Sequence, residues 1–167
     1  PTPEQSPLER IAHYKDQHGQ PLDLHTASVE LLNLLRPTVA VSVFITFAAL
    51  ALHKHPFCLR NLQSGDERDI GCFVQEVRRF YPFFPAISAR VKEDFLWEGF
   101  SFGRGTLVLL DLYGTNHDSQ LWEEADRFKP ERFRSNSPSP YCFIPQGPGD
   151  PHVNHRCPGE GVAVALM

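Results

Sequence analysis

The chain has 167 residues, enough to bury one hydrophobic core, and this length favours about one domain. Hydrophobic residues make up 41% and charged residues 22%, at a mean hydropathy of −0.30, which is ordinary for a globular protein. The net charge of −4, with scattered Lys and Arg residues, excludes the basic footprint of a nucleic-acid-binding protein. Four cysteines without a C-x-x-C pair exclude a disulfide scaffold, so we expect a reducing, cytoplasmic location.

The first third of the chain predicts two helices. Residues 7–17 form a short amphipathic segment, and a long helix follows over about residues 26–54, with Thr26 or Ser28 as its N-cap. The apolar run inside the long helix, residues 39–52, is shorter than the roughly 20 residues that cross a bilayer. We therefore expect a buried core helix and no membrane span.

The middle of the chain predicts further helix and then strands. A short turn of helix is expected over residues 57–63, and Asp66 or Asp69 then begins a helix over about residues 66–80. Period-two alternation in "ISARVKEDFLW", "FSF" and "TLVLLDL" predicts three short strands in a β region of about residues 86–112. The predicted fold class is mainly α with a small antiparallel β portion.

The last third holds long loops rich in Pro, Gly and Ser, and ordered loops of this length are usually functional. One of them, about residues 141–159, ends in "CPGEG", and the start of a helix over residues 160–167 follows, with Pro158 suited to the first turn. The chain opens without Met and stops inside an apolar periodic segment, so we expect a fragment of a longer protein.

Cys157 is the first candidate for chemistry. It ends the Gly/Pro-rich loop just before a helix N-terminus, where the positive end of the helix dipole favours a thiolate. The glycines around it, Gly147 and Gly159 among them, let the backbone approach a flat cofactor, so the thiolate suits an axial ligand of haem iron. Two alternatives stay open: a small buried cysteine, and a zinc site with His152 and His155 that lacks a clear fourth ligand.

Glu76 and Arg79 form an E-x-x-R pair on the predicted helix, where residues three apart share one face. Such pairs usually lie on a solvated surface. The segment "KPERF" adds Arg132, which can join the pair in a three-member ionic cluster. If the cluster is buried, it supports fold specificity more reliably than net stability.

Three motifs in this order resemble the cytochrome P450 superfamily of haem-thiolate enzymes: E-x-x-R, then "NHDSQLWEEADRFKPERF", then the Gly-containing loop that ends in "CPGEG". The resemblance covers nearly all of residues 1–167 and implies a partial cytochrome P450 domain, a fragment from the C-terminal half of that fold. It implies that Glu76, Arg79 and Arg132 hold the core on the cysteine side.

The same resemblance implies a cofactor, haem b (iron protoporphyrin IX), with Cys157 as the axial ligand of its iron. Gln146 matches a loop glutamine of the family near the thiolate, and His155 stands two residues before the cysteine, where a basic residue often faces a haem propionate. Gly147 and Gly159 belong to the same cofactor-binding loop.

Within the superfamily, the chain resembles the bacterial fatty-acid peroxygenases through "LLNLLRPTVAVSVFITFAALALH", "VQEVRRFYPFFP", "GTLVLLDLYGTNHD" and "IPQGPGDPHVNHRCPGEG". Most superfamily members carry an acid–Thr motif in the long helix, whereas Thr38 and Thr46 have no acidic neighbour here. In the peroxygenases an Arg-Pro pair replaces that motif, and its Arg binds the substrate carboxylate, which then serves as acid and base. The match falls on Arg36 and Pro37, the expected catalytic residues.

The physical chemistry of Arg36 agrees with this implied role. An unpaired guanidinium beside an apolar wall is costly and needs an anion, and its planar fork suits a carboxylate. A fatty acid supplies both the anion and an alkyl tail. The alternative is an Arg at a helix bend whose side chain extends to solvent and pairs with Glu30 or with another segment.

The implied function is peroxide-dependent hydroxylation, or decarboxylation, of long-chain fatty acids. The expected partners are a fatty acid and hydrogen peroxide, without nucleic acid and without a required redox partner. Two further alternatives are a reductase-dependent monooxygenase of the same superfamily and an inactive truncated fragment that binds no haem.

Overall fold

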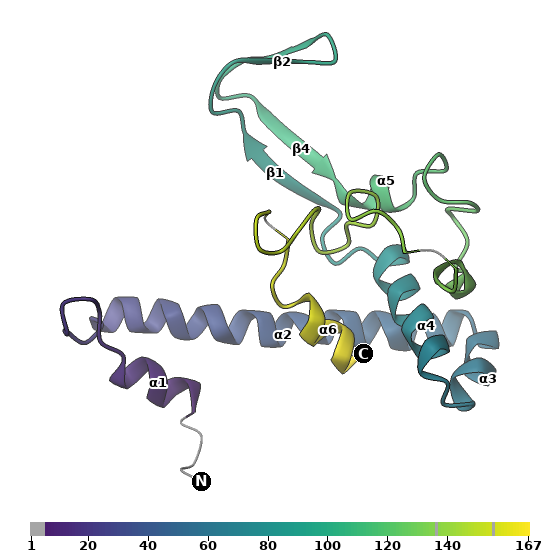
Figure 1. Ribbon diagram of the computed structural model, residues 1–167, viewed down its shortest axis with the longest axis horizontal. Helices are drawn as coiled ribbons and strands as arrows, with labels where there is room; N and C mark the ends of the chain where they lie inside the picture. Colours follow the sequence, from purple (N-terminus) through teal and green to yellow (C-terminus); the bar gives the residue numbers. More distant parts are fainter. Residues whose placement is uncertain (1–5, 136, 155) are drawn as a thin grey trace. The chain divides into compact units, whose positions relative to one another are not determined.

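The computed structural model describes residues 6–135, 137–154 and 156–167. The chain is mainly helical with two small antiparallel sheets, the fold class predicted from the sequence (Figure 1). It divides into two compact units, one ending at Val43 and the other beginning at Phe44. The boundary lies inside one long helix.

The first unit contains α1 (Pro7–His13) and the beginning of α2 (Leu24–Lys54). A capping box begins α1: the Ser6 hydroxyl accepts from Glu9 N at 3.2 Å, and the Glu9 carboxylate accepts from Ser6 N at 2.8 Å. The helix ends at His13, earlier than predicted, because Tyr14 has an extended backbone.

The start of α2 differs from the predicted N-cap. Asp23 takes the capping role, since its carboxylate accepts from Thr26 N at 3.1 Å and from the Thr26 hydroxyl at 2.7 Å. Thr26 and Ser28 lie inside the helix, where the Ser28 hydroxyl donates to the Leu24 carbonyl at 2.7 Å. Asp, Ser and Thr are all good N-caps, so their order in the sequence does not decide which one begins the helix.

The interior of α2 continues through Pro37, although proline has no N–H to donate to the Asn33 carbonyl. The expected burial of this helix is found only at Phe44, Ala48 and Ala51. Within the part of the chain that the structure describes, α2 alone is long and apolar enough to cross a membrane, with a mean hydropathy of 1.8 over 18 residues. Core helices of globular proteins pass the same test, so this is weak evidence for a span.

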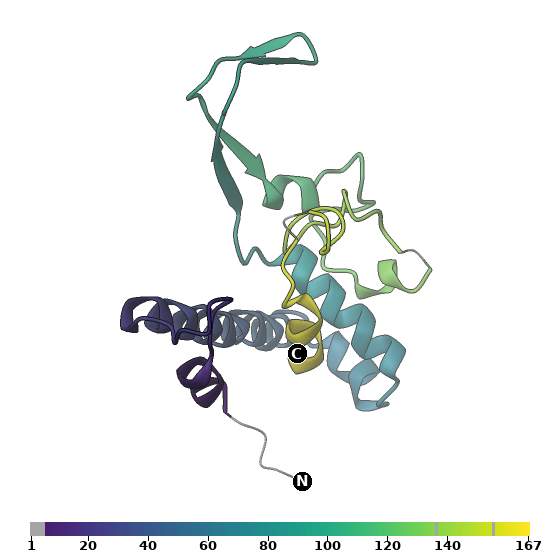
Figure 2. The same cartoon turned by 60° about the vertical axis from the view of Figure 1, so that its left-hand side comes forward.

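The second unit is organised around α4 (Glu67–Phe80), which contacts α3 (Phe57–Gln63), α5 (Leu112–Asn116) and the 3₁₀ helix η1 (Pro130–Phe133) (Figures 1 and 2). One hydrophobic face of α4 meets the end of α2 and α3 in a core that Phe128 completes. Its buried members are Ala48, Ala51, Cys58, Phe73, Val77 and Phe128.

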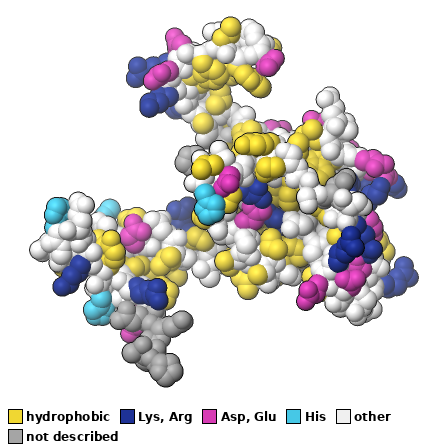
Figure 3. Space-filling view, in the orientation of Figure 1, with side chains coloured by type: hydrophobic (Ala, Val, Ile, Leu, Met, Phe, Trp, Pro, Cys, Tyr) yellow, Lys and Arg dark blue, Asp and Glu magenta, His cyan; other side chains and the backbone are white. Residues whose placement is uncertain are grey.

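The β region forms two separate antiparallel pairs. Strand β1 (Ala86–Arg90) pairs with β4 (Leu107–Asp111), and β2 (Phe95–Trp97) pairs with β3 (Phe100–Phe102). The first predicted strand is therefore interrupted, because Asp94 leaves the ladder and its carboxylate accepts from the backbone of the facing turn. Several apolar side chains of these strands are exposed (Figure 3).

The N-cap of α4 gives a test of the fold. The Asp66 carboxylate accepts from Arg68 N at 2.9 Å and satisfies a free donor of the first turn. Asp66→Ala should lower the free energy of unfolding by about 1 kcal/mol, measured by urea denaturation. Asp66→Asn keeps an equally good cap and should leave the stability near that of the parent protein; equal losses in both variants would contradict the capping role.

Candidate functional site

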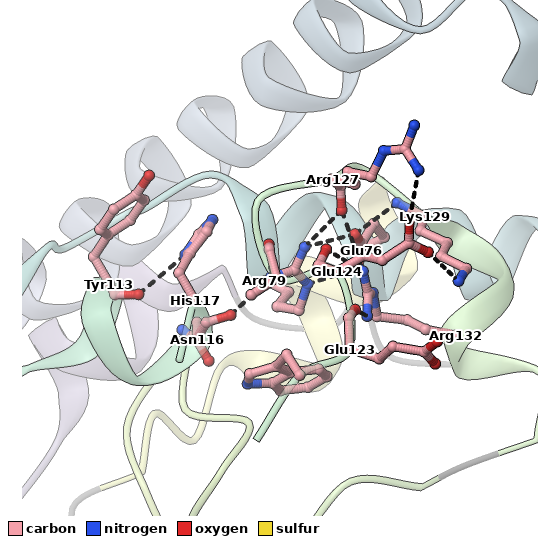
Figure 4. A network of polar contacts seen from close by, with 12 residues as sticks. Glu76, Arg79, Tyr113, Asn116, His117, Glu123, Glu124, Arg127, Lys129 and Arg132 are labelled. Carbon is pink, nitrogen blue, oxygen red and sulfur yellow. Dashed lines mark hydrogen bonds and ion pairs between the residues drawn. The ribbon is translucent and has the colours of Figure 1, made fainter. Parts of the chain in front are cut away.

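A buried ion pair joins Glu76 and Arg79 on one face of α4 (Figure 4). Both residues are nearly excluded from solvent, with exposed fractions of 0% and 1%. Arg79 Nε and Nη2 donate to the two Glu76 carboxylate oxygens at 2.9 and 2.8 Å, so the pairing is bidentate. Arg132 Nε lies 3.1 Å from Glu76 Oε2, and Lys129 N donates to Glu76 Oε1 at 2.8 Å. The structure thus brings the three predicted members of the cluster together.

The two arginines of this cluster also bind the loop after α5. Arg79 Nη1 donates to the carbonyls of Asn116 and Ala125, at 2.7 and 2.9 Å. The Arg127 carbonyl accepts from Arg79 at 3.1 Å and from Arg132 at 3.2 Å, and Arg132 also donates to Glu123 and Glu124 carbonyls. Backbone acceptors of residues 116–127 that lack partners in a helix or strand are therefore satisfied by buried cations.

Asn116 connects this cluster to the loop of about residues 141–159 that contains Cys157 (the cysteine loop). Its carbonyl accepts from Arg79, and its side-chain oxygen accepts from Ile144 N at 3.1 Å; both residues are buried. Trp122 packs against Phe143 of the same loop, and the Arg79 guanidinium lies 5.4 Å from the centre of the Trp122 ring. The ion cluster and the cysteine loop are therefore parts of one packed region.

Cys157 lies near the end of this loop, just before α6 (Glu160–Leu166). Its N–H donates to the Gln146 carbonyl at 2.9 Å, and its own carbonyl accepts from Glu160 N at 3.3 Å. The Cys157 residue is exposed, so the alternative of a small buried cysteine does not hold for it. Cys58 is such a buried cysteine, and its burial raises the pKa of that thiol to about 11.

Glycines shape the loop that leads to Cys157. Gly147 and Gly149 have φ values of 102° and 78°, which L side chains rarely adopt, and a Cβ on Gly149 would collide with the Asn154 amide. A Cβ on Gly159 would lie 3.7 Å from Cys157 Sγ, in ordinary contact. The loop can therefore turn tightly and leave the sulfur accessible.

This donor set fits a haem-thiolate site. A single exposed thiol with a fixed backbone and small neighbours suits one axial position on a flat cofactor. Within residues 6–135, 137–154 and 156–167, no three His, Cys, Asp or Glu side chains are grouped so that they could hold a metal ion. His155, which is needed for the zinc alternative and for the predicted propionate contact, lies outside the described residues.

Arg36 and Pro37 lie in the first unit, on the exposed surface of α2. In the described part of the chain, no hydrogen bond or ion pair joins the Arg36 side chain to another residue, so the alternative pairing with Glu30 is not formed there. Arg36 and Glu30 are six positions apart in the sequence, whereas side chains that meet on a helix are three or four positions apart.

The sequence did not indicate several polar residues of this region. Arg78, Arg156 and Glu160 form an ion network beside Cys157. This network includes the predicted residue Gln146, whose side-chain oxygen accepts from Arg78 at 3.1 Å. Asn116 lies in the quoted motif, but its contact with Ile144 spans 28 residues. The adjacent arginines in "VQEVRRF" are visible in the sequence, but nothing in the pattern shows that Arg78 is buried as well as Arg79.

The sequence profile of the cytochrome P450 family matches residues 72–167, more than half of the chain. The chain belongs to the cytochrome P450 family. Among curated relatives, cytochrome P450 3A15 of Cavia porcellus is 39% identical over 94 residues, which cover 54% of this chain and 18% of that protein. The chain therefore spans only a small part of such a relative.

Solved structures extend the similarity over nearly the whole chain. Cytochrome P450EX alpha, solved with myristic acid, is 54% identical at a TM-score of 0.80, covering 92% of this chain and 37% of that one. A variant of cytochrome P450 OleT, solved with arachidonic acid, is 39% identical at a TM-score of 0.84, covering 99% and 39%. These cytochrome P450 structures confirm the resemblance to the fatty-acid peroxygenase subfamily and the fold class, as part of the P450 fold.

The buried cluster predicts a large effect of removing its anion. Glu76→Gln should lower the free energy of unfolding by about 3–5 kcal/mol, because Arg79 and Arg132 would keep two buried charges without a countercharge. The matched control is Glu124→Gln, which breaks exposed ion pairs with Arg127 and Lys129 and should have a small effect. Urea denaturation compares the two; similar losses would contradict the special role of Glu76.

His117 predicts a pH dependence of stability. Burial lowers the pKa of His117 below its ordinary value of 6.5, and a hydrogen bond to the Tyr113 carbonyl acts in the opposite direction (Figure 4). On acidification, the unfolded chain takes up the His117 proton at a higher pH than the folded protein does. The contribution of His117 to the free energy of unfolding is therefore fully present above pH 6.5, and it is lost as the pH falls through the pKa of the folded protein. His117→Phe should weaken the fall in stability on acidification, measured as urea midpoints at several pH values. An unchanged slope would contradict this origin.

Proposed function

We propose that the protein containing this chain is a haem-thiolate oxidoreductase that uses hydrogen peroxide to hydroxylate, or decarboxylate, long-chain fatty acids. The supporting observation is the likeness, over at least 92% of this chain, to P450 structures solved with myristic and arachidonic acid. Arg36 on α2, which has no partner among the described residues, supplies the cation that such a carboxylate needs.

Cys157 would hold the haem iron through its thiolate sulfur. Its backbone is held by Gln146 and Glu160. Gly147 allows the tight turn of the loop at a φ of 102°, and Gly159 places no side chain next to the sulfur. Bound haem would supply the oxidising chemistry with peroxide as the oxidant. The residues of this chain would contribute the thiolate ligand and its orientation.

Arg36 would bind the substrate carboxylate with two parallel N–H···O bonds. The bound carboxylate would then accept a proton from peroxide and return it, in place of a protein acid. No acid is adjacent to Thr38 in the sequence, and the Thr38 hydroxyl donates to the Leu34 carbonyl at 3.0 Å. Pro37 leaves the Asn33 carbonyl without its helical donor, and we assign it to shaping α2 next to Arg36.

The reductase-dependent alternative differs in its oxidant. A peroxygenase turns over a fatty acid with hydrogen peroxide alone, whereas a monooxygenase of the same family needs reduced nicotinamide nucleotide and a reductase. Product formation by the haem-loaded protein under the two conditions, followed by mass spectrometry, separates them. Turnover only with the reductase would overturn the peroxide-dependent proposal, and a protein that binds no haem would overturn the enzyme proposal.

Replacing Arg36 tests the carboxylate-binding role. Arg36→Ala should weaken fatty-acid binding by about 10- to 100-fold, the effect of losing a hydrogen bond to a charged group, and should abolish peroxide-dependent turnover. Haem content should stay unchanged, because Arg36 lies outside the cysteine loop. Binding is measured as the substrate-induced change in the haem absorbance.

Two control variants sharpen this test. Arg36→Lys keeps a charge but not the planar fork, so it should restore only part of the affinity. Arg60→Ala removes an exposed arginine of α3 and should leave binding and turnover unchanged. Fatty-acid turnover that survives in Arg36→Ala would show that another group holds the carboxylate.

A further inference from the structure

Arg78 is a buried arginine that the Glu76 cluster does not use. It precedes Arg79 on α4, so its side chain leaves the helix in a different direction, and its exposed fraction is only 2%. Its ion pair is with Glu160 and not with Glu76. The Arg78 guanidinium also lies 5.1 Å from the ring centre of Phe143, in the cysteine loop. A second buried cation thus faces the loop that carries the candidate haem ligand.

The Arg78 guanidinium is divided among three side chains. Its Nε donates to Gln146 Oε1 at 3.1 Å, its Nη1 to Gln75 Oε1 at 2.5 Å, and its Nη2 to Glu160 Oε1. Gln146 and Glu160 are 68 and 82 residues away in the sequence, and they lie on the two sides of Cys157: Gln146 before it in the cysteine loop and Glu160 after it at the start of α6. All three arms of the planar fork are therefore in use.

Gln146 and Glu160 are also the two residues whose backbone binds Cys157. The Gln146 carbonyl accepts from Cys157 N at 2.9 Å, and Glu160 N donates to the Cys157 carbonyl at 3.3 Å. One guanidinium thus binds the side chains of both residues that hold the cysteine backbone. A lysine or an apolar residue cannot span the two positions, because a point charge lacks the rigid fork.

Glu160 is held from a second side by Arg156. Arg156 Nε and Nη2 donate to the Glu160 carboxylate at 2.5 and 2.7 Å, and Arg156 Nη1 donates to the Gly149 carbonyl at 3.1 Å. Burial opposes ionisation of Glu160, but the two arginines outweigh it and lower the pKa of its carboxyl. The carboxylate between two cations fixes the segment on both sides of Cys157.

We propose that Arg78 is a positioning residue for Cys157: it sets the direction of the sulfur by fixing Gln146 and Glu160, independently of the Glu76–Arg79–Arg132 cluster. This inference rests on the proposed function, in which Cys157 ligates the haem iron. If the bonds from Arg78 to Gln146 and Glu160 (the Arg78 clamp) are removed, we expect the fold and the haem pocket to remain and the thiolate to lose its fixed direction toward the iron. The effect is therefore on ligation and not on haem content.

The test uses Arg78→Met in the haem-loaded protein that contains this chain. Methionine keeps apolar volume against Phe143 but removes the charge and the three hydrogen bonds. The readout is the share of the reduced, CO-bound haem that shows the Soret band of a thiolate ligand, relative to total haem extracted from the same sample. We expect the ratio of thiolate-ligated to unligated haem to fall about tenfold, with total haem near the parent level.

Val77→Ala is the matched control. Val77 is fully buried on the same helix and contributes to the hydrophobic core, so its truncation destabilises the fold without touching Gln146 or Glu160. A general loss of stability would affect both variants, whereas positioning of the sulfur affects only Arg78→Met. Arg78→Lys should behave like Arg78→Met, because it restores the charge but not the fork.

The outcomes separate the two proposals. If the parent protein shows the thiolate band and the band persists equally in Arg78→Met and Val77→Ala, the positioning role of Arg78 is overturned, but the ligation by Cys157 is not. A parent protein that binds haem without any thiolate band overturns the ligation by Cys157, and this inference with it. If Arg78→Met does not fold, Gln146→Ala takes its place, since it leaves Arg78 paired with Glu160; an unchanged thiolate share in that variant overturns the clamp.

Discussion

The buried carboxylate of Glu76 is the interaction on which the second unit depends. A fully buried anion is tolerated only when cations and hydrogen-bond donors replace water, and here Arg79, Arg132 and the backbone of Lys129 do so. The two arginines use their remaining donors on carbonyls of residues 116–127. A segment with little regular structure is thus ordered by a charge on α4, and this order reaches Ile144 through Asn116.

The sequence predicted those parts of the fold that depend on local patterns. The hydrophobic face of α4, its start near Asp66 or Asp69, and the mainly helical class with a small β portion follow from short-range propensity and periodicity. The predicted N-cap of α2 was wrong because Asp23, Thr26 and Ser28 are all good N-cap residues. The prediction of one long first strand was wrong because the Asp94 side chain bonds to a turn and interrupts it. Both errors are choices among local options that only the backbone geometry decides.

The residues of the candidate site could be predicted where they belong to a sequence motif, but not where long-range contacts alone place them there. Cys157, Glu76, Arg79 and Arg132 stand in recognisable motifs, so the order and spacing of residues along the chain are enough to indicate them. The burial of Arg78 depends on Gln146 and Glu160, which are 68 and 82 residues away, and no periodicity in α4 distinguishes it from an exposed arginine. Adjacent arginines with the same propensity therefore have different environments that the sequence alone does not reveal.

The neighbouring positions of Arg78 and Arg79 explain how one helix organises two segments. Consecutive residues on a helix point about 100° apart, so one arginine reaches the loop of residues 116–127 while the other reaches the cysteine segment. Each guanidinium gives part of its hydrogen bonds to neighbours on α4 and the rest to its own distant segment. An incomplete arrangement therefore leaves buried N–H donors without acceptors. The native placement of both segments is thereby favoured over alternatives of similar hydrophobic burial, and α4 acts as the common support of the cluster and of the Cys157 loop.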